Sequence, residues 1–312
     1  MGLDQLRQRF SDYEVVLEPD KDIPEWWAGA PSVCRDGDGV FWLACRMREG
    51  NSPRGQRGYE IRILRSEDGV SFTPVHSLRR EEVPIPGFER PALVYNRGDE
   101  SFSLYGCGPF AGGLWCILRF DDAATPTEFE PSTCRPVIMP EPVPEGSVVS
   151  RLLGYKDPFV FGEAGLRHCF AIGFDKVERA YHFVSADGEA WKRVGDGPCF
   201  DVGGWHSFFT RPAAVLPLGA GYLLVYEGSH PTWHDPVYNI ATGLAWSPDL
   251  VEFVDLTPDG PLLTSTTPGD CMTWRYSHWM WVEDELFVYA EVARPNNTNE
   301  IRLWRLPARF LP

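Results

Sequence analysis

The sequence predicts an all-β fold, a five-bladed β-propeller, on three observations. First, a unit with a proline at its fourth position recurs at residues 88–92, 155–159 and 209–213. Second, segments of roughly five to eight residues rich in Val, Ile, Phe, Tyr and Trp alternate with clusters of Gly, Pro and Asp. Third, helical periodicity is nearly absent. Repeats spaced by roughly fifty to sixty residues are typical of stacked supersecondary units, and a propeller is the natural array of such units.

Two further copies of the unit bring the total to five. Residues 29–33 precede the apolar run 41–46, and residues 276–280 precede the run 286–291. Five blades of about fifty residues each account for most of the chain and leave the rest for loops. We therefore predict one domain, residues 1–312, with blades at residues 29–78, 88–132, 155–198, 209–256 and 274–306.

Short motifs predict the turns between the outer strands of the blades. A Ser-x-Asp sequence, with an aromatic residue four positions after the Asp, recurs at residues 66–72, 185–191 and 247–253. In the first two copies a glycine follows the Asp, and Asp-Gly supplies the positive φ that a tight turn needs. These segments are predicted to be hairpin turns.

Four other segments complete the predicted architecture. Residues 4–10 carry the one helical pattern, and residues 13–18 are predicted to close the ring beside residues 301–306. Residues 48–58 lengthen a turn of the first blade, and residues 135–154 form a long connection between the second and third blades. Long loops on a rigid scaffold are often functional, and a solvated insertion is the alternative.

Composition restricts the partners and the compartment. The formal net charge is -15 and the pI is about 4.9, which argues against a nucleic acid or an anionic membrane surface as partner. No apolar stretch approaches eighteen residues and the N-terminus resembles no signal peptide, so a cytoplasmic location is predicted. The eight cysteines show no metal-ligand spacing, and we expect buried reduced thiols, with no metal and no cofactor.

Charged residues recur at the position that precedes each proline, which in a propeller lines the central axis. Read in order, this position holds Ala30, Arg90, Asp157, Arg211 and His278. Neighbouring positions on the first and second strands add Glu89, Lys156, Arg46, Glu227 and Glu291. Charged residues are almost never fully buried unless paired, so this set predicts either a ligand pocket or ion pairs that lock neighbouring blades. Trp205 and His206 lie nearby and could contact a sugar ring.

The repeats and motifs resemble the five-bladed propeller glycosidases, glycoside hydrolase families 43, 32, 117 and 130, over about residues 25–306. The sequence Tyr155-Lys156-Asp157-Pro158 is similar to the Asp-Pro element of family 43, whose Asp orients and tunes the catalytic acid. Glu89-Arg90-Pro91 resembles the Glu-Gly-Pro motif of family 43 and the Glu-Asp-Pro motif of family 130. Family 130 is similar in layout, and the resemblance implies that Arg46 and Arg211 contact a phosphate.

Two departures separate this chain from those families. Arg90 stands where family 130 has its acid, and Ala30 stands where families 43 and 32 have their base. The remaining carboxylates predicted to transfer protons are Asp157, Glu227 and Glu89. The residues predicted to bind substrate are Arg46, Arg90, Lys156, Arg211, His278, Glu291, Trp205 and His206.

Three functions follow from this set. The first is a glycoside hydrolase acting on a short oligosaccharide, which the arginines would allow to be anionic. The second is a phosphorylase that uses inorganic phosphate as cosubstrate. The third is a carbohydrate-binding propeller without catalysis, which the residues at positions 30 and 90 favour.

Overall fold

The computed structural model describes residues 3–110, 113–142, 152–174, 177–234 and 237–307. The chain forms two compact units, each described here by itself. The middle unit comprises residues 32–201, and the terminal unit comprises residues 1–31 and 202–312. Strand β2 (Trp27–Arg35) begins in the terminal unit and ends in the middle unit.

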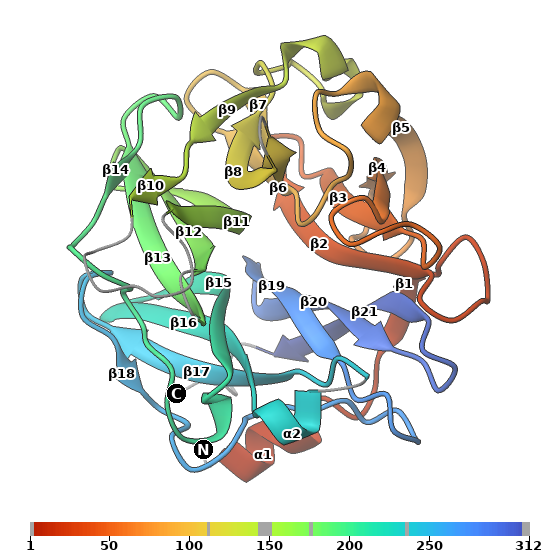
Figure 1. The fold of residues 1–312 in the computed structure, drawn as a ribbon, viewed down its shortest axis with the longest axis vertical. Helices are drawn as coiled ribbons and strands as arrows, with labels where there is room; N and C mark the ends of the chain where they lie inside the picture. Colours follow the sequence, from red (N-terminus) through yellow and green to blue (C-terminus); the bar gives the residue numbers. More distant parts are fainter. Residues whose placement is uncertain (1–2, 111–112, 143–151, 175–176, 235–236, 308–312) are drawn as a thin grey trace. The chain divides into compact units, whose positions relative to one another are not determined.

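The middle unit contains three groups of antiparallel strands (Figure 1). Each group is a succession of neighbours in the chain, as expected for propeller blades. The first group is the end of β2 with β3 (Phe41–Arg48), β4 (Gly58–Ser66) and β5 (Thr73–Arg79). The second is β6 (Ala92–Asn96), β7 (Ser101–Phe110), β8 (Leu114–Arg119) and β9 (Arg135–Ile138). The third is β10 (Glu141–Pro142), β11 (Leu152–Glu163), β12 (Leu166–Phe174), β13 (Glu178–Ser185) and β14 (Lys192–Arg193).

The terminal unit contains two further groups (Figure 1). One is β15 (Phe209–Leu218), β16 (Gly221–Ser229), β17 (Ala241–Ser247) and β18 (Val254–Asp255). The other is β19 (Trp274–Val282), β20 (Glu285–Ala293) and β21 (Asn299–Pro307). The short helices among the described residues are α1 (Leu3–Gln8), η1 (Arg80–Glu82), η2 (Pro126–Glu128), η3 (Pro131–Thr133), η4 (Gly204–His206) and α2 (Pro231–His234).

The predicted closure by the N-terminal segment is confirmed. Strand β1 (Glu14–Leu17) pairs antiparallel with β21, and Glu14 lies opposite Leu303. The predicted helix is also present as α1, and Phe10 behind it packs on Trp274 with ring centroids 5.7 Å apart. Trp304 stacks on Trp274 at 4.2 Å and donates a hydrogen bond to the Phe10 carbonyl. Phe10, which follows the helix, therefore packs into an aromatic cluster of the last blade.

Two apolar clusters fill the space between neighbouring blades of the middle unit. One joins the first and second blades and includes Ile61, Leu104 and Leu118. The other joins the second and third blades and includes Ile117 and Tyr155. Alternate residues of these strands belong to the same cluster. Successive side chains of a strand point to opposite faces, so one face of each strand packs against the neighbouring blade.

The predicted Ser-x-Asp turns are confirmed by their hydrogen bonds. In each copy the Ser hydroxyl accepts a backbone N–H three residues later, and the Asp carboxylate accepts two N–H groups beyond the turn. Gly69 and Gly188 have φ of 72° and 77°, and Leu250 adopts 64° at the equivalent position of the third copy. Local side-chain bonds thus set these turns.

The prediction of a continuous loop over residues 135–154 is wrong at both ends. Residues Arg135–Ile138 form β9, Glu141–Pro142 form β10, and β11 begins at Leu152. Ile138 is buried and pairs with Ile117. Strand β9 is the last strand of its sheet, and at such an edge a proline removes no ladder hydrogen bond. Residues 143–151 lie outside the described residues. The predicted loop 48–58 is confirmed, because β3 ends at Arg48 and β4 begins at Gly58.

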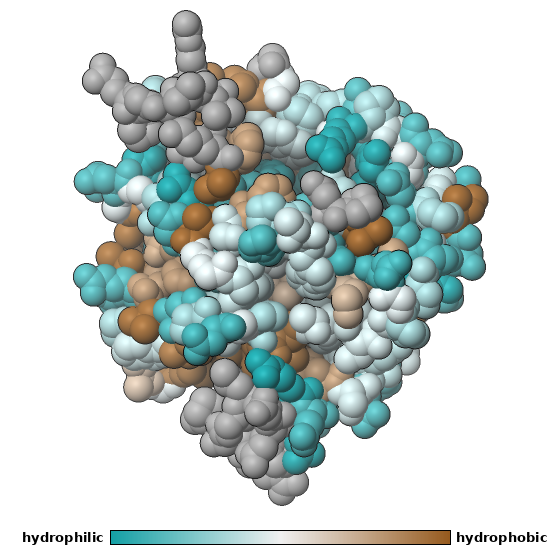
Figure 2. Space-filling model, turned by 60° about the horizontal axis from the view of Figure 1, so that its bottom comes forward, coloured by the Kyte–Doolittle hydropathy of each residue, from teal (hydrophilic) through white to brown (hydrophobic). Residues whose placement is uncertain are grey.

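The surface mixes polar and apolar residues. On the face shown in Figure 2, hydrophilic and hydrophobic residues are interspersed. No helix in the described part of the chain is long and apolar enough to cross a membrane.

A buried histidine pair predicts a pH-dependent stability. His168 Nδ1 and His182 Nε2 are 3.0 Å apart, and the two rings stack. Burial lowers the pKa of His168, against a smaller raising effect of Glu163. The unfolded chain therefore binds a proton at higher pH than the folded chain does. The contribution of His168 to the free energy of unfolding should be fully present above about pH 6.5. Below that pH it should fall, by at most about 1.4 kcal/mol per pH unit for one proton.

Urea denaturation of the wild type and of His168→Phe between pH 7.5 and 5 would check this. The wild type should lose more stability on acidification than the variant does. His230→Gln removes an exposed imidazole and serves as the control. Equal acid sensitivity of the wild type and His168→Phe would contradict the expectation.

Candidate functional site

Three equivalent inner-strand residues adopt a left-handed backbone conformation. Ala30, Asp157 and Tyr276 have φ of 53°, 55° and 51°, which is uncommon for residues other than glycine. The pairing register shifts at the last two, between Lys156 and Phe159 and again across Tyr276. We call these three positions the bulge residues. The structure therefore places Tyr276, and not His278, at the fifth copy of the recurrent position. Ser277 follows it where a proline follows the other four copies, so the sequence did not mark it.

Each bulge residue is held by a side chain from the second strand of the preceding blade. Glu291 Oε2 accepts the N–H of Ala30 at 3.0 Å, and a Glu227 carboxylate oxygen accepts the N–H of Tyr276. In the third case Cys107 Sγ accepts the N–H of Asp157 at 3.0 Å. We call Cys107, Glu227 and Glu291 the bulge clamps. They satisfy a buried backbone donor that the irregular strand leaves outside its ladder.

Glu291 is fully engaged inside the terminal unit. Its Oε1 accepts hydrogen bonds from Arg275 Nε at 3.0 Å, Arg275 Nη2 at 2.7 Å and Asn299 Nδ2 at 2.6 Å. The side chain has no solvent exposure, and a Cβ added at Gly29 would lie 1.9 Å from Oε2. The predicted substrate-binding role of Glu291 thus competes with a structural network that already uses its carboxylate.

Glu227 repeats this arrangement one blade earlier. It lies directly opposite Arg211 in the β15–β16 ladder, as Glu291 lies opposite Arg275 in the β19–β20 ladder. Glu227 is 1% exposed, and the Arg211 guanidinium lies 4.0 Å from the centre of the Phe209 ring. The structure therefore brings Glu227, Arg211 and Tyr276 together within the terminal unit. His278 lies two residues further along β19, opposite Tyr289.

Asp157 is the bulge residue of the middle unit, and it is the acidic one of the three. Its Oδ1 accepts the N–H of Arg90 at 3.2 Å and lies 3.6 Å from Cys107 Sγ. Asp157 and Arg90 are each 1% exposed, and the Arg90 guanidinium lies 5.6 Å from the centre of the Phe159 ring. A carboxylate within β11 and a guanidinium just before β6 are thus both held away from bulk water.

Two ion pairs flank Asp157. Arg46 pairs with Glu89, whose side chain is 20% exposed, and Lys156 Nζ lies 2.6 Å from a Glu178 oxygen. Glu89 is therefore more accessible to a ligand than Asp157 is. Together, the charged residues of this cluster comprise three cations and three carboxylates, namely Arg46, Arg90, Lys156, Glu89, Asp157 and Glu178. Because these charges balance, a neutral ligand would not leave an excess charge.

Trp205 and His206, predicted to contact a sugar, take part in a buried polar network. Trp205 Nε1 donates to the Thr257 carbonyl at 2.7 Å. His206 Nδ1 lies 2.8 Å from Thr210 Oγ1, and its Nε2 lies 3.3 Å from Asp255. Tyr226 also donates to Asp255, at 2.9 Å. These contacts account for both rings by packing and hydrogen bonding within the β15–β18 blade.

Sequence reasoning missed Arg275 and Tyr276, which lack a following proline. Gly106 or Cys107 stands at the second-strand position that corresponds to Glu227 and Glu291, but Cys107 carries no charge and its role as a clamp was not predicted. Arg211 and Arg275 each lie on a first strand opposite a Glu of the second strand. An Arg and a Glu on successive strands of one blade were therefore the available signal. Within the described residues, no group of three or more His, Cys, Asp or Glu could hold a metal ion.

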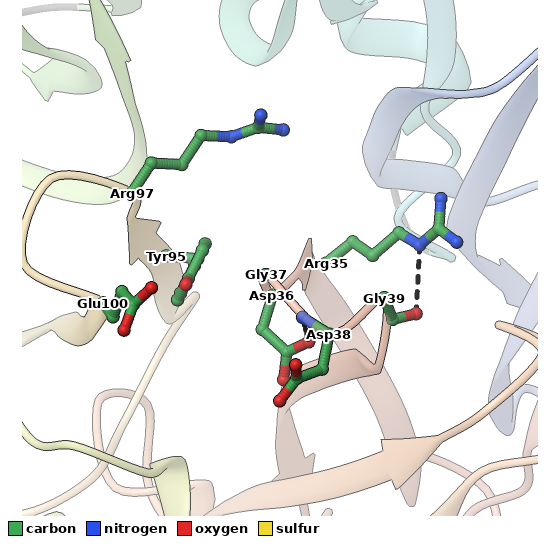
Figure 3. A pocket seen from close by; sticks show the side chains of 8 residues that line it. All are labelled: Arg35, Asp36, Gly37, Asp38, Gly39, Tyr95, Arg97 and Glu100. Atoms are coloured by element: carbon green, nitrogen blue, oxygen red, sulfur yellow. Dashed lines mark hydrogen bonds between the residues drawn. The ribbon is translucent and has the colours of Figure 1, made fainter.

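A separate cavity of about 530 Å³ lies between two turns of the middle unit (Figure 3). It is lined by the β2–β3 turn and by the start of the β6–β7 connection: Arg35, Asp36, Gly37, Asp38, Gly39, Tyr95, Arg97 and Glu100. Figure 3 shows the Arg35 side chain bonded to the Gly39 carbonyl, with Nε 3.0 Å away. Arg90 precedes β6 and Tyr95 is near its end, so this cavity lies at the opposite end of that strand from the Asp157 cluster.

Solved structures similar to this chain are five-bladed β-propellers. One is from glycoside hydrolase family 130, whose mannoside phosphorylases are accompanied by hydrolases that target β-1,2-mannosidic linkages in Candida mannan. It is 15% identical with a TM-score of 0.68, and the match covers 94% of this chain and 93% of that one. A thermostable family-43 glycoside hydrolase is 13% identical with a TM-score of 0.63, over 92% and 91%. The Bombyx mori family-32 β-fructofuranosidase is 12% identical with a TM-score of 0.67, over 96% and 64%.

The predicted fold class is therefore confirmed: the chain has the five-bladed propeller fold of these glycosidases over nearly its full length. At such low identity the likeness is one of fold. No protein-family profile matches the chain, and no curated protein does.

Proposed function

We propose that this protein is a glycoside hydrolase that cleaves the terminal bond of a short oligosaccharide, with Asp157 as a proton-transfer carboxylate. The observation that carries the proposal is the environment of Asp157. It is a carboxylate on an inner strand, fixed by the Arg90 N–H and by Cys107 and withdrawn from bulk water. The shared fold with families 43, 32 and 130 supports carbohydrate as the ligand class.

Glycosidic cleavage generally uses two carboxylates that flank the scissile bond. Glu89 is the second carboxylate in this proposal, because it precedes Arg90, whose N–H binds Asp157, and because its side chain is partly exposed. Glu227 is less suited to that role, since its carboxylate holds the Tyr276 N–H. Arg90 and Lys156 would contact sugar hydroxyls or a carboxylate, and Arg46 would orient Glu89.

Phosphorolysis is the second candidate. The observation in its favour is that two guanidinium groups, Arg46 and Arg90, lie beside the carboxylates with almost no solvent exposure. Guanidinium groups bind phosphate through paired hydrogen bonds. In this reading a phosphate would compete with Glu89 for Arg46, and Arg211 remains a candidate phosphate contact within the terminal unit.

The test is a panel of neutral and uronic-acid oligosaccharides, incubated with and without inorganic phosphate. Hydrolysis should release free reducing sugar without phosphate, and Glu89→Gln should lower that rate at least about a hundredfold. Glu227→Gln should retain most of the turnover. Products that form only with phosphate would favour phosphorolysis. Binding measured by calorimetry without any turnover would reject both reactions and identify a carbohydrate-binding propeller.

A further inference from the structure

The three bulge clamps differ in charge, and the difference follows the residue that they hold. Glu227 and Glu291 hold Tyr276 and Ala30, whose side chains carry no charge. Cys107 holds Asp157. A glutamate at position 107 would place a second carboxylate against Asp157 in a buried site, and two adjacent carboxylates cannot both ionise without a large cost. The neutral clamp therefore occurs at the bulge residue that is itself acidic.

Cys107 contacts Asp157 twice. Its sulfur accepts the Asp157 N–H at 3.0 Å, and its thiol lies 3.6 Å from Asp157 Oδ1, with the Arg90 carbonyl at 3.9 Å as the other acceptor. The side chain is fully buried. Burial, reinforced by the Asp157 charge, raises the pKa of the thiol well above its ordinary value. Cys107 therefore presents an uncharged thiol donor to the Asp157 carboxylate.

We infer that Cys107 is a positioning residue for Asp157: its sulfur fixes the bulge through the backbone N–H, and its uncharged thiol faces the carboxylate where a glutamate clamp would place a second negative charge. This inference rests on the proposed function for its catalytic consequence. The other charged groups of this cluster are Arg46, Glu89, Arg90, Lys156 and Glu178, and the Cys169 thiol on β12 lies near Arg90. Replacing Cys107 changes none of them.

The experiment measures the carboxyl titration of Asp157 directly, by ¹³C NMR of aspartate-labelled protein, with Asp157→Asn to assign the signal. Cys107→Asp should move the titration midpoint upward by about one pH unit or more, because a like charge opposes ionisation. Cys107→Ser keeps an acceptor and a donor, so its midpoint should stay near that of the wild type. Cys116→Ser, a buried thiol of β8 that contacts the Gly108 carbonyl, is the matched control.

Activity gives the second measurement. Cys107→Ala should lower kcat about tenfold or more through misplacement of Asp157, and Cys107→Ser should restore most of it. The acid limb of the rate profile should follow the NMR midpoint. If Cys107→Asp does not fold, the kcat values of Cys107→Ala and Cys107→Ser still test the positioning role. An unchanged midpoint in Cys107→Asp, or wild-type kcat in Cys107→Ala, would overturn the inference. If the wild type turns over no oligosaccharide, the proposed function fails, and the NMR titration still tests the positioning role.

Discussion

Replacing Asp157 by asparagine should lower turnover at least about a hundredfold while leaving the melting temperature nearly unchanged. Asparagine keeps the size of the side chain and the oxygen that accepts the Arg90 N–H at 3.2 Å. It also tolerates the positive φ of 55° at this position. What it lacks is a transferable proton, and general acid or base groups contribute about 10² to 10⁴ in rate. Steady-state kinetics of the purified variant would measure the loss of turnover, and thermal denaturation would measure the melting temperature.

The control for this prediction is Asp38→Asn. Asp38 is an exposed residue of the β2–β3 turn in the same unit, so its replacement should change neither rate nor stability. Full activity of Asp157→Asn would remove Asp157 from the reaction. A large drop in melting temperature would instead show that the charge of Asp157 is needed for folding, and the loss of rate would then say nothing about proton transfer.

Replacing Glu291 by leucine should destabilise the protein by about 3 to 5 kcal/mol, the usual cost of leaving a buried charge uncompensated. The variant leaves the Arg275 guanidinium without its carboxylate and removes the acceptor of the Ala30 N–H. Urea denaturation monitored by tryptophan fluorescence would measure the change, because Trp274 and Trp279 are buried in β19, the strand that carries Arg275.

Two further variants test whether the loss of stability comes from the unpaired Arg275 charge. Asp284→Asn alters an exposed carboxylate in the β19–β20 turn and should cost almost nothing. The double variant Glu291→Leu with Arg275→Met should recover part of the loss, because it removes the orphaned cation. A cost below about 1 kcal/mol for Glu291→Leu would mean that the network contributes little and would return Glu291 to the candidates for ligand binding.

Local patterns predicted most of the fold. The Ser-x-Asp turns, the N-terminal helix and the pairing of β1 with β21 follow from residues whose preferences are set by near neighbours or by strand alternation. The failure over residues 135–154 has a local cause too. Four prolines resembled a loop, but the prolines of β9 and β10 stand on edge strands, where they break no ladder.

The site was harder to predict because its contacts are long-range. Glu291 and Ala30 are separated by 261 positions, and Glu227 and Tyr276 by 49, and no spacing rule connects such pairs. Recurrent charge singled out Glu227, Glu291 and Asp157, which are all buried. It could not show that each of them accepts a backbone N–H. The repeat places Gly106 or Cys107 at the position equivalent to Glu227 and Glu291, but because Cys107 carries no charge, its contact with Asp157 could not be predicted.

The bulge clamps have an evolutionary consequence. Because each bulge is stabilised through its backbone N–H by a side chain of the preceding blade, the bulge residue itself contributes little to holding its own conformation. Alanine, aspartate and tyrosine occupy the three positions with φ within a few degrees of one another. Such positions can exchange side chains without rebuilding the blade. A lineage can therefore exchange neutral residues at these points by single substitutions, whereas a new acidic residue also needs an uncharged clamp, as Cys107 is for Asp157.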